Sequence, residues 1–370
     1  MKYNYTLYLR FTIVAVLFTL LYACGTDDTD AYTEIPDTPE EQESPVVMDI
    51  NAVPYATLSQ YNFFEGDLKN LQPVYKVIPY DLHSSLFTDY AKKKRFIWMP
   101  KGTQATYTTD GKIPVFPVGT VLIKNFYYDN TIPDNGTTII ETRLMIKKPE
   151  GWIFAEYIWN NEQTEAVLDT EGGLKRVGWY KDGEPMSLNY KIPATTACAT
   201  CHTANDVYTP IGVKPQNLNK MYAYADGEKN QLSKWVDTGY LDNKPAAINS
   251  SVDWTDASQP LELRVRAYLD INCAHCHSLG TSCDYTPMEL SFQQSALPAN
   301  LGICQEPVDF VTGNQQYIIA GQDVQGSLMH FRMSTNVQSE MMPTLGRTIV
   351  HEEGLQLIED WINSIDTTCP

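Results

Sequence analysis

The alternation of apolar and polar residues divides the chain into a strand-rich part and a helix-rich part. Between residues 49 and 193, apolar and β-branched residues come in short runs bounded by Pro, Gly and Asp, and helical periodicity is sparse. The runs that predict strands are residues 116–128, 138–147, 152–159, 178–180 and 186–192. Turn residues join the second run to the third and the fourth to the fifth. The pattern therefore predicts an antiparallel β domain over residues 49–193, folded as a sandwich or a barrel.

Helical periodicity takes over in the second half of the chain. The segments in which apolar residues recur three and four positions apart are residues 229–240, 261–270, 328–331 and 352–365. We predict two mainly α-helical units after the β domain, one over residues 194–255 and the other over residues 256–370. The expected fold class is α+β, with several domains.

The N-terminal residues have the pattern of an export signal. Lys2 and Arg10 accompany a mostly apolar stretch at residues 11–21, which is too short for an ordinary membrane-spanning helix. Residues 1–23 are therefore predicted to be a signal peptide. Residues 24–48 are acidic and dominated by Thr, Asp, Glu and Pro, a composition that predicts a flexible tether. We see no later stretch that is long and apolar enough to span a bilayer.

Composition limits the partners. Apolar residues make up 43% of the chain, which is enough for a buried core, and the formal net charge is −18. Such a surface repels nucleic acid and anionic lipid headgroups, so we expect no nucleic-acid partner. It would attract a basic redox partner, although solubility is the commoner reason for an acidic surface.

Two copies of one cysteine–histidine motif carry the candidate chemistry. They read Cys198-Ala-Thr-Cys201-His202 and Cys273-Ala-His-Cys276-His277. This spacing is the attachment signature of c-type haem. The two thiols add to the vinyl groups of one porphyrin, and the adjoining histidine ligates the iron as its proximal ligand. The sequence therefore predicts two covalently bound haems, held by Cys198, Cys201, Cys273 and Cys276, with His202 and His277 as iron ligands.

These motifs have two other interpretations. A single Cys-x-x-Cys pair could be a redox dithiol, and two such pairs could form a zinc site with four cysteine ligands. Neither reading requires a histidine directly after both second cysteines, so the repeated histidine favours haem.

Three further cysteines follow the second motif. Cys283 and Cys304 bracket a loop rich in Pro, Ser and Gln, and an exported protein folds in an oxidising compartment. We expect a disulfide between Cys283 and Cys304, which would leave Cys369 as the odd cysteine. Alternatively, either of the first two pairs with Cys369.

The residues after the apolar stretch, Leu21-Tyr22-Ala23-Cys24-Gly25, resemble a bacterial lipobox. The resemblance implies that Cys24 becomes the lipidated first residue of the mature protein. The alternative is simple secretory cleavage near Ala23. A lipid anchor on Cys24 would place the protein in the cell envelope, in the periplasm, at the outer membrane or at the cell surface.

The second motif lies in a familiar order of elements. A predicted helix runs into Cys273, and another follows near the C-terminus, an order that resembles the frame of small cytochrome c domains. In those domains the two helices pack across one another. The resemblance implies that Ala267 or Tyr268 meets Trp361.

The same resemblance implies a sixth ligand for the second haem. In small cytochromes c with histidine and methionine ligands, the methionine commonly precedes a proline shortly before the terminal helix. Met342 precedes Pro343 in that position, so Met342 is the implied ligand and Met341 the next candidate. The alternative is that both methionines fill gaps in the core.

The sixth ligand of the first haem stays open. The candidates are Met221, Met99, His83 and His351, or an iron without a protein ligand on that side. An open iron could bind peroxide or a gas, so this position separates electron transfer from catalysis.

From about Tyr80 to Ile365, the chain resembles a bacterial family of dihaem c-type cytochrome lipoproteins with a β-rich N-terminal domain. The resemblance rests on residues 80–82, 86–87, 98–100, 116–121, 141–144, 159–160, 162–164, 210–212, 217–219, 272–277 and 342–343. It implies haem binding and electron transfer without a settled substrate. We therefore expect an electron-transfer protein at a membrane surface rather than an enzyme. The alternatives are a dihaem peroxidase-like enzyme with one open iron, and a ligand-binding β domain whose haems relay electrons.

Overall fold

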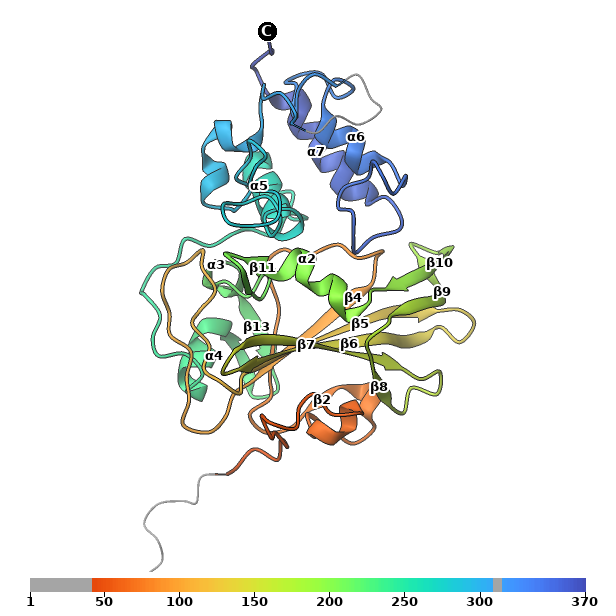
Figure 1. The fold of residues 1–370 in the computed structure, drawn as a ribbon, viewed down its shortest axis with the longest axis vertical. Coiled ribbons are helices and arrows are strands. Elements are labelled where there is room, and N and C mark those ends of the chain that lie inside the picture. The colour runs from red at the N-terminus through yellow and green to blue at the C-terminus, as the bar shows by residue number, and fades with distance from the viewer. Residues whose placement is uncertain (1–41, 309–314) are drawn as a thin grey trace, which may run out of the picture. The chain divides into compact units, whose positions relative to one another are not determined.

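The strands form one antiparallel sheet of eight strands in the computed structural model, which describes residues 42–308 and 315–370 (Figure 1). The pairing order is β10-β9-β5-β6-β7-β8, while β4 pairs with β5 and with β3. The strands are β3 (Ile78–Tyr80), β4 (Lys92–Trp98), β5 (Val121–Thr131), β6 (Gly136–Lys148), β7 (Gly151–Trp159), β8 (Ala166–Asp169), β9 (Gly173–Lys181) and β10 (Glu184–Ile192). The prediction of an antiparallel β domain is confirmed.

The sheet does not form the predicted sandwich or barrel. Its order ends at β10 on one side and at β8 on the other, and the other strands of the described residues pair only in twos. These pairs are β1 (Phe64–Glu65) with β2 (Gln72–Pro73), β11 (Thr203–Ala204) with β12 (Val207–Tyr208), and β13 (Met221–Tyr224) with β14 (Gly227–Asn230). Loops and short helices cover the sheet instead. The sequence pattern reports that a strand face is buried but not which element covers it.

Both faces of the sheet are buried. Successive side chains of a strand point to opposite sides, so neighbouring residues of β5 pack in different clusters. On β5, Val121 and Ile123 pack in a cluster with residues of the N-terminal segment, among them Tyr61. Leu122 lies in a second cluster that includes Leu232 of a later helix. The β domain and the segment after the first motif therefore share a core.

The strand predicted at residues 116–128 begins later than expected. The Thr120 amide donates to the Pro117 carbonyl over 3.2 Å, and Gly119 has a φ of 90°, a conformation that favours glycine. Residues 117–120 therefore form a turn, and β5 starts at Val121.

The folded part of the chain begins before the predicted end of the tether at residue 48. Val46 and Met48 are partly buried against the first core cluster, and the Val47 amide donates to the Tyr61 carbonyl over 2.9 Å. The signal peptide, Cys24 and most of the tether lie outside the described residues. Within residues 42–308 and 315–370, no helix has the length and apolarity needed to cross a membrane.

The helices are short and lie mainly after the sheet. They are α2 (Cys198–His202), α3 (Pro215–Leu218), α4 (Gln231–Thr238), α5 (Leu261–Asn272), α6 (Leu328–Ser334) and α7 (Glu352–Ser364). Single 3₁₀ turns are η1 (Leu58–Tyr61), η2 (Leu68–Asn70), η3 (Thr195–Ala197), η4 (Gln294–Ala296) and η5 (Pro298–Leu301). In α4, the Asn230 side chain accepts from the Ser233 amide, and Gly239 ends the helix at a φ of 82°.

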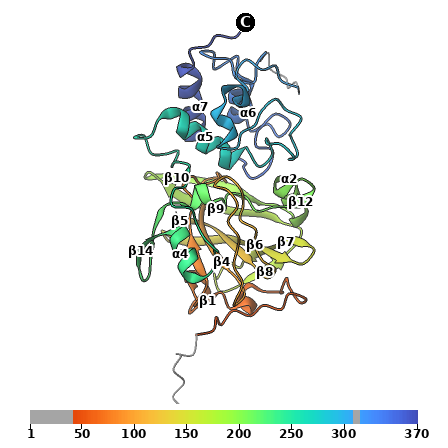
Figure 2. The ribbon, with the colours of Figure 1, turned by 90° about the vertical axis from the view of Figure 1, so that its left-hand side faces the viewer.

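The helices α5 and α7 pack against each other, as Figure 2 shows. Tyr268 of α5 and Trp361 of α7 belong to one buried cluster, the pair that the sequence suggested would meet. A β-carbon at Gly354 of α7 would collide with the hydroxyl end of the Tyr268 side chain of α5. A glycine at this position therefore leaves room for that side chain.

One disulfide joins Cys304 to Cys369, with 5.2 Å between their α-carbons. The preferred pairing of Cys283 with Cys304 is therefore wrong, and the alternative with Cys369 is found. The physical reason is the return of the C-terminal segment past Ile319. The Cys304 amide donates to the Ile319 carbonyl, and the Cys369 sulfur contacts the same oxygen at 3.7 Å.

Candidate functional site

The first motif forms the helix α2, directly after the last strand of the sheet (Figure 1). One helical turn brings Cys198 and Cys201, three residues apart, to the same side. The ring of the adjoining His202 lies 5.3 Å from that of Phe154 on β7. Strand β7 therefore positions this motif against the sheet.

The imidazole of His202 has the tautomer and the neutral state that a metal ligand needs. Its Nδ1 atom lies 2.9 Å from the Thr209 carbonyl oxygen, which can only accept, so Nδ1 carries the proton and Nε2 keeps its lone pair. Burial lowers the pKa of His202 to about 3 and keeps the ring neutral. A carbonyl that fixes the ring through its second nitrogen is the usual support of a histidine ligand.

The second motif follows the end of α5 and has the same support. The His277 Nδ1 lies 3.1 Å from the Thr286 hydroxyl, and that hydroxyl donates to the Cys283 carbonyl over 2.7 Å. The hydroxyl oxygen therefore accepts from Nδ1, and Nε2 of His277 is left for a ligand. Burial lowers the pKa of His277 as well.

Each motif lines a large cavity. The first cavity has an empty volume of about 1250 Å³, part of it open to solvent, and is lined by Cys198, Cys201 and His202. The second cavity has an empty volume of about 1450 Å³, also partly open, and is lined by Cys273, Cys276 and His277. Neutral histidines with a free Nε2 at large, mostly apolar cavities fit the requirements of a covalently attached haem.

The structure places Met342 in the second cavity together with His277. Buried Arg347 donates from Nε and from one Nη to the Met342 carbonyl, over 3.1 and 2.9 Å, and so holds this loop in place. Met341 is buried and lines a different, smaller cavity. Of the two adjacent methionines, Met342 is the one that shares a cavity with His277.

The residues suggested as a sixth ligand of the first haem do not line the first cavity. Met221 is 52% exposed, and Met99 is packed in the core. The His83 Nε2 lies 3.1 Å from the Asn219 carbonyl. His351 lines the second cavity, where its Nδ1 lies 3.0 Å from the Tyr268 hydroxyl.

Other potential ligands line the first cavity. They are Lys124 on β5, Met145 on β6 and His275 inside the second motif. Their place at the cavity is not predictable from the sequence, because strand residues far from the motif give no spacing signal. One signal was available for Lys124, a lysine within a buried apolar run.

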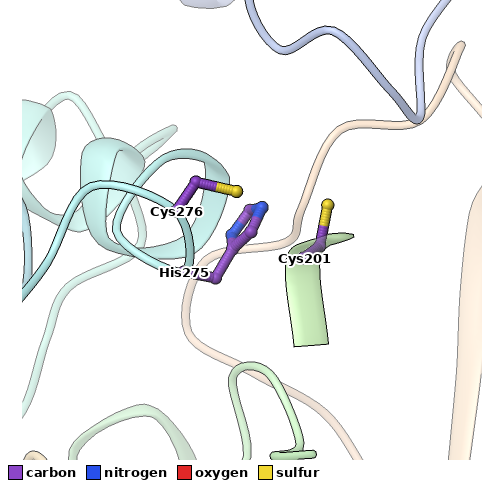
Figure 3. A group of neighbouring side chains, drawn as sticks. All are labelled: Cys201, His275 and Cys276. Atoms are coloured by element: carbon purple, nitrogen blue, oxygen red, sulfur yellow. The ribbon is translucent and has the colours of Figure 1, made fainter. Parts of the chain in front are cut away.

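The two motifs meet, as Figure 3 shows. The sulfurs of Cys201 and Cys276 and a ring nitrogen of His275 all lie within 4.8 Å of one another. The Nδ1 atom of His275 is buried and has no hydrogen-bond partner among the described residues. Two thiolates and an imidazole could bind Zn²⁺, but such a site would use neither His202 nor His277.

The sheet forms a wall of the first cavity. Residues of β5, β6 and β7 line it opposite the motif, among them Leu122, Arg143 and Phe154. The β domain therefore builds part of the candidate site rather than standing apart from it.

Comparison with family models, with curated proteins and with solved structures gives no match to this chain. The assignment of a function therefore depends on the residues and their geometry.

Proposed function

We propose that the protein is an exported dihaem c-type cytochrome that transfers electrons at a membrane surface. The observation that carries the proposal is the pair of Cys-x-x-Cys-His motifs, which line two cavities and meet at Cys201 and Cys276, within 4.8 Å. A protein that only stored or transported haem would not need two attachment sites at this separation.

Each motif would hold one haem through two thioether bonds and one histidine ligand. Cys198, Cys201 and His202 would hold the first. Cys273, Cys276 and His277 would hold the second, with Met342 as its sixth ligand. Each bound haem supplies an iron that gains or loses one electron. The role of the chain is to fix both groups, exclude most water from the cavities and set the two potentials.

The neighbouring sulfurs support electron exchange between the two groups. Because Cys201 and Cys276 belong to different motifs, their attachment would bring an edge of one porphyrin next to an edge of the other. An electron that enters at one cavity would therefore reach the second without leaving the protein. His275 lines both cavities and lies at this junction.

The helical frame supports a cytochrome c-like second unit at residues 256–370. Helix α5 leads into the second motif, and α7 packs against α5. A methionine thioether stabilises ferrous iron and raises the reduction potential. We therefore assign the higher potential to the haem of His277.

The membrane link and the partner that we propose are those expected from the sequence. A lipid on Cys24 would tether the folded part through the acidic segment that follows. The net charge of −18 favours a basic redox partner, whose association should weaken as salt rises.

A dihaem peroxidase-like enzyme is the second candidate. It is favoured by one observation, the absence from the first cavity lining of every sixth ligand that the sequence suggested. A β domain that binds a separate ligand has less support because its sheet lines the first cavity.

Redox titration with a peroxide assay separates these candidates. A carrier should take up two electrons in two one-electron steps and should not turn over hydrogen peroxide with a reduced donor. Rapid peroxide turnover would favour the enzyme. A protein that takes up no electrons would contradict both.

A further inference from the structure

A row of basic side chains crosses the sheet beneath the first cavity. Arg95 on β4 lies directly opposite Lys124 on β5, and Lys124 lies directly opposite Arg143 on β6. Like charges directly opposite each other on neighbouring strands destabilise a sheet. The arrangement is unexpected in a chain with a net charge of −18.

The two outer members of the row have acidic partners. Arg95 donates to an Asp81 carboxylate oxygen over 2.8 Å, and Arg143 donates to a Glu141 carboxylate oxygen over 2.5 Å. The Nε atom of Arg143 is buried and has no hydrogen-bond partner among the described residues. Its remaining neighbour is the Glu156 carboxyl at 3.9 Å.

Glu156 does not supply the missing charge. Burial and a hydrogen bond to the adjacent Glu141 carboxylate raise the pKa of Glu156 well above its usual value, so this carboxyl keeps its proton. A protonated carboxyl carries no negative charge that could pair with Lys124 or Arg143.

Lys124 is the member of the row without an acidic partner in the described part of the chain. Its ammonium lies 4.8 Å from the centre of the Phe126 ring, which the Arg143 guanidinium approaches at 4.5 Å. Burial, together with Arg95 and Arg143, lowers the pKa of Lys124 well below its usual value. Beside two guanidinium groups, Lys124 would keep its positive charge only if an anion lay next to it.

The Lys124 side chain lies at the cavity of the first motif. Lys124 and Arg143 both line it, together with Cys198 and Cys201. We propose that Lys124 and Arg143 form a binding site for a carboxylate group inside the first cavity. This inference rests on the proposed function for one source of the carboxylate, a propionate of the attached porphyrin. The other source is a free small carboxylate.

The test uses the holo-protein with Lys124→Leu, which removes the charge and introduces no group that can ligate iron. A cation near the iron stabilises the reduced form, which carries one positive charge less. If a propionate binds here, the variant should keep both covalent haems. The reduction equilibrium constant of the first haem should fall about tenfold, which is about 59 mV for one electron.

Two controls separate charge from fold. Lys92→Leu removes a lysine of the neighbouring strand β4 that pairs with Asp129 and is 61% exposed, and should leave both potentials unchanged. Lys124→Arg keeps the positive charge, so the potential of the first haem should stay close to its wild-type value. The second haem, for which Met342 is the proposed sixth ligand, serves as an internal reference in every variant.

Calorimetric titration with acetate distinguishes the two sources. If the carboxylate is a propionate, wild-type protein should not bind acetate and the potential should shift as described. If it is a free carboxylate, wild-type protein should bind acetate one-to-one, and Lys124→Leu should not. A Lys124→Leu protein with both haems, an unchanged potential and unchanged acetate behaviour would overturn the carboxylate site. A wild-type protein without covalent haem would instead contradict the proposed function.

Discussion

The two motifs have the same spacing, but the walls of their cavities differ. The first cavity has the buried sheet as a wall, and that wall presents the charged side chains of Lys124 and Arg143. The second is bounded by α5, α6 and the loop that carries Met342. The motif determines attachment and the proximal ligand, whereas the wall determines what faces the other side of the iron. Two haems attached in the same way should therefore differ in potential and in ligand binding.

The largest expected effect separates the two cavities at Met342. Met342→Leu should remove the weak charge-transfer band of methionine-ligated ferric haem and lower one of the two potentials, because leucine cannot ligate iron. The matched control is Met341→Leu, which replaces a buried side chain by one of similar volume and should cost less than about 1.5 kcal/mol of stability. A band that persists in Met342→Leu, or disappears in Met341→Leu, would exclude Met342 as the ligand.

The next effect concerns the disulfide, which closes a loop after the second motif and has no counterpart near the first among the described residues. Replacing Cys304 and Cys369 by serine opens a loop of 65 residues. Loss of this cross-link should lower the free energy of unfolding by about 4 kcal/mol in denaturant titrations. Cys283→Ser should not cause such a loss. Equal effects of the two changes would argue against the pairing.

The crossing of α5 and α7 tests the helical frame. Gly354→Ala places a methyl group against the Tyr268 ring and should destabilise the protein by about 2 kcal/mol. Gln356→Ala, at an exposed position of the same helix, should change the stability by less than about 0.5 kcal/mol. Thermal unfolding of both variants measures the difference. An unchanged stability of the Gly354→Ala protein would mean that Tyr268 of α5 does not lie against Gly354 of α7.

The smallest effect is a pH dependence that arises in the wall of the first cavity. Burial raises the pKa of Glu156 well above its usual value, so the folded state keeps a proton that the unfolded state releases near pH 4.3. This contribution to stability is complete below the unfolded pKa and is lost as the pH rises toward the folded one. The free energy of unfolding should therefore fall by about 1.4 kcal/mol for each pH unit in which the folded state holds this proton and the unfolded state does not. Glu156→Gln should flatten that slope, and a slope that survives the change must come from other groups.

Local pattern predicted the elements better than their assembly. The strand pairs β6–β7 and β9–β10, and the helices α4, α5 and α7, follow from apolar spacing and turn residues close to the predicted positions. The start of β5 was misplaced because a Pro–Gly turn precedes a continuous apolar run. The order of the strands was not predictable, since alternation gives the buried face and not the neighbour.

The candidate site was predictable where its residues are adjacent in sequence. The cysteines and histidines of both motifs follow from spacing alone, and Met342 from its place before a proline. The sheet wall of the first cavity and the meeting of Cys201 with Cys276 depend on contacts between residues far apart in the chain. The pairing of Cys304 with Cys369 depends on the return of the C-terminus to Ile319 in the same way.

Haem content is the most direct test of the central claim that each motif holds its own haem. Pyridine haemochrome analysis and intact mass of the exported protein should give two covalent haems per chain. Replacing both cysteines of the first motif by alanine should leave one, and replacing those of the second should also leave one. Metal analysis of the same samples should give two irons and no zinc. Zinc in place of iron, or an unchanged haem count after loss of either motif, would contradict the account.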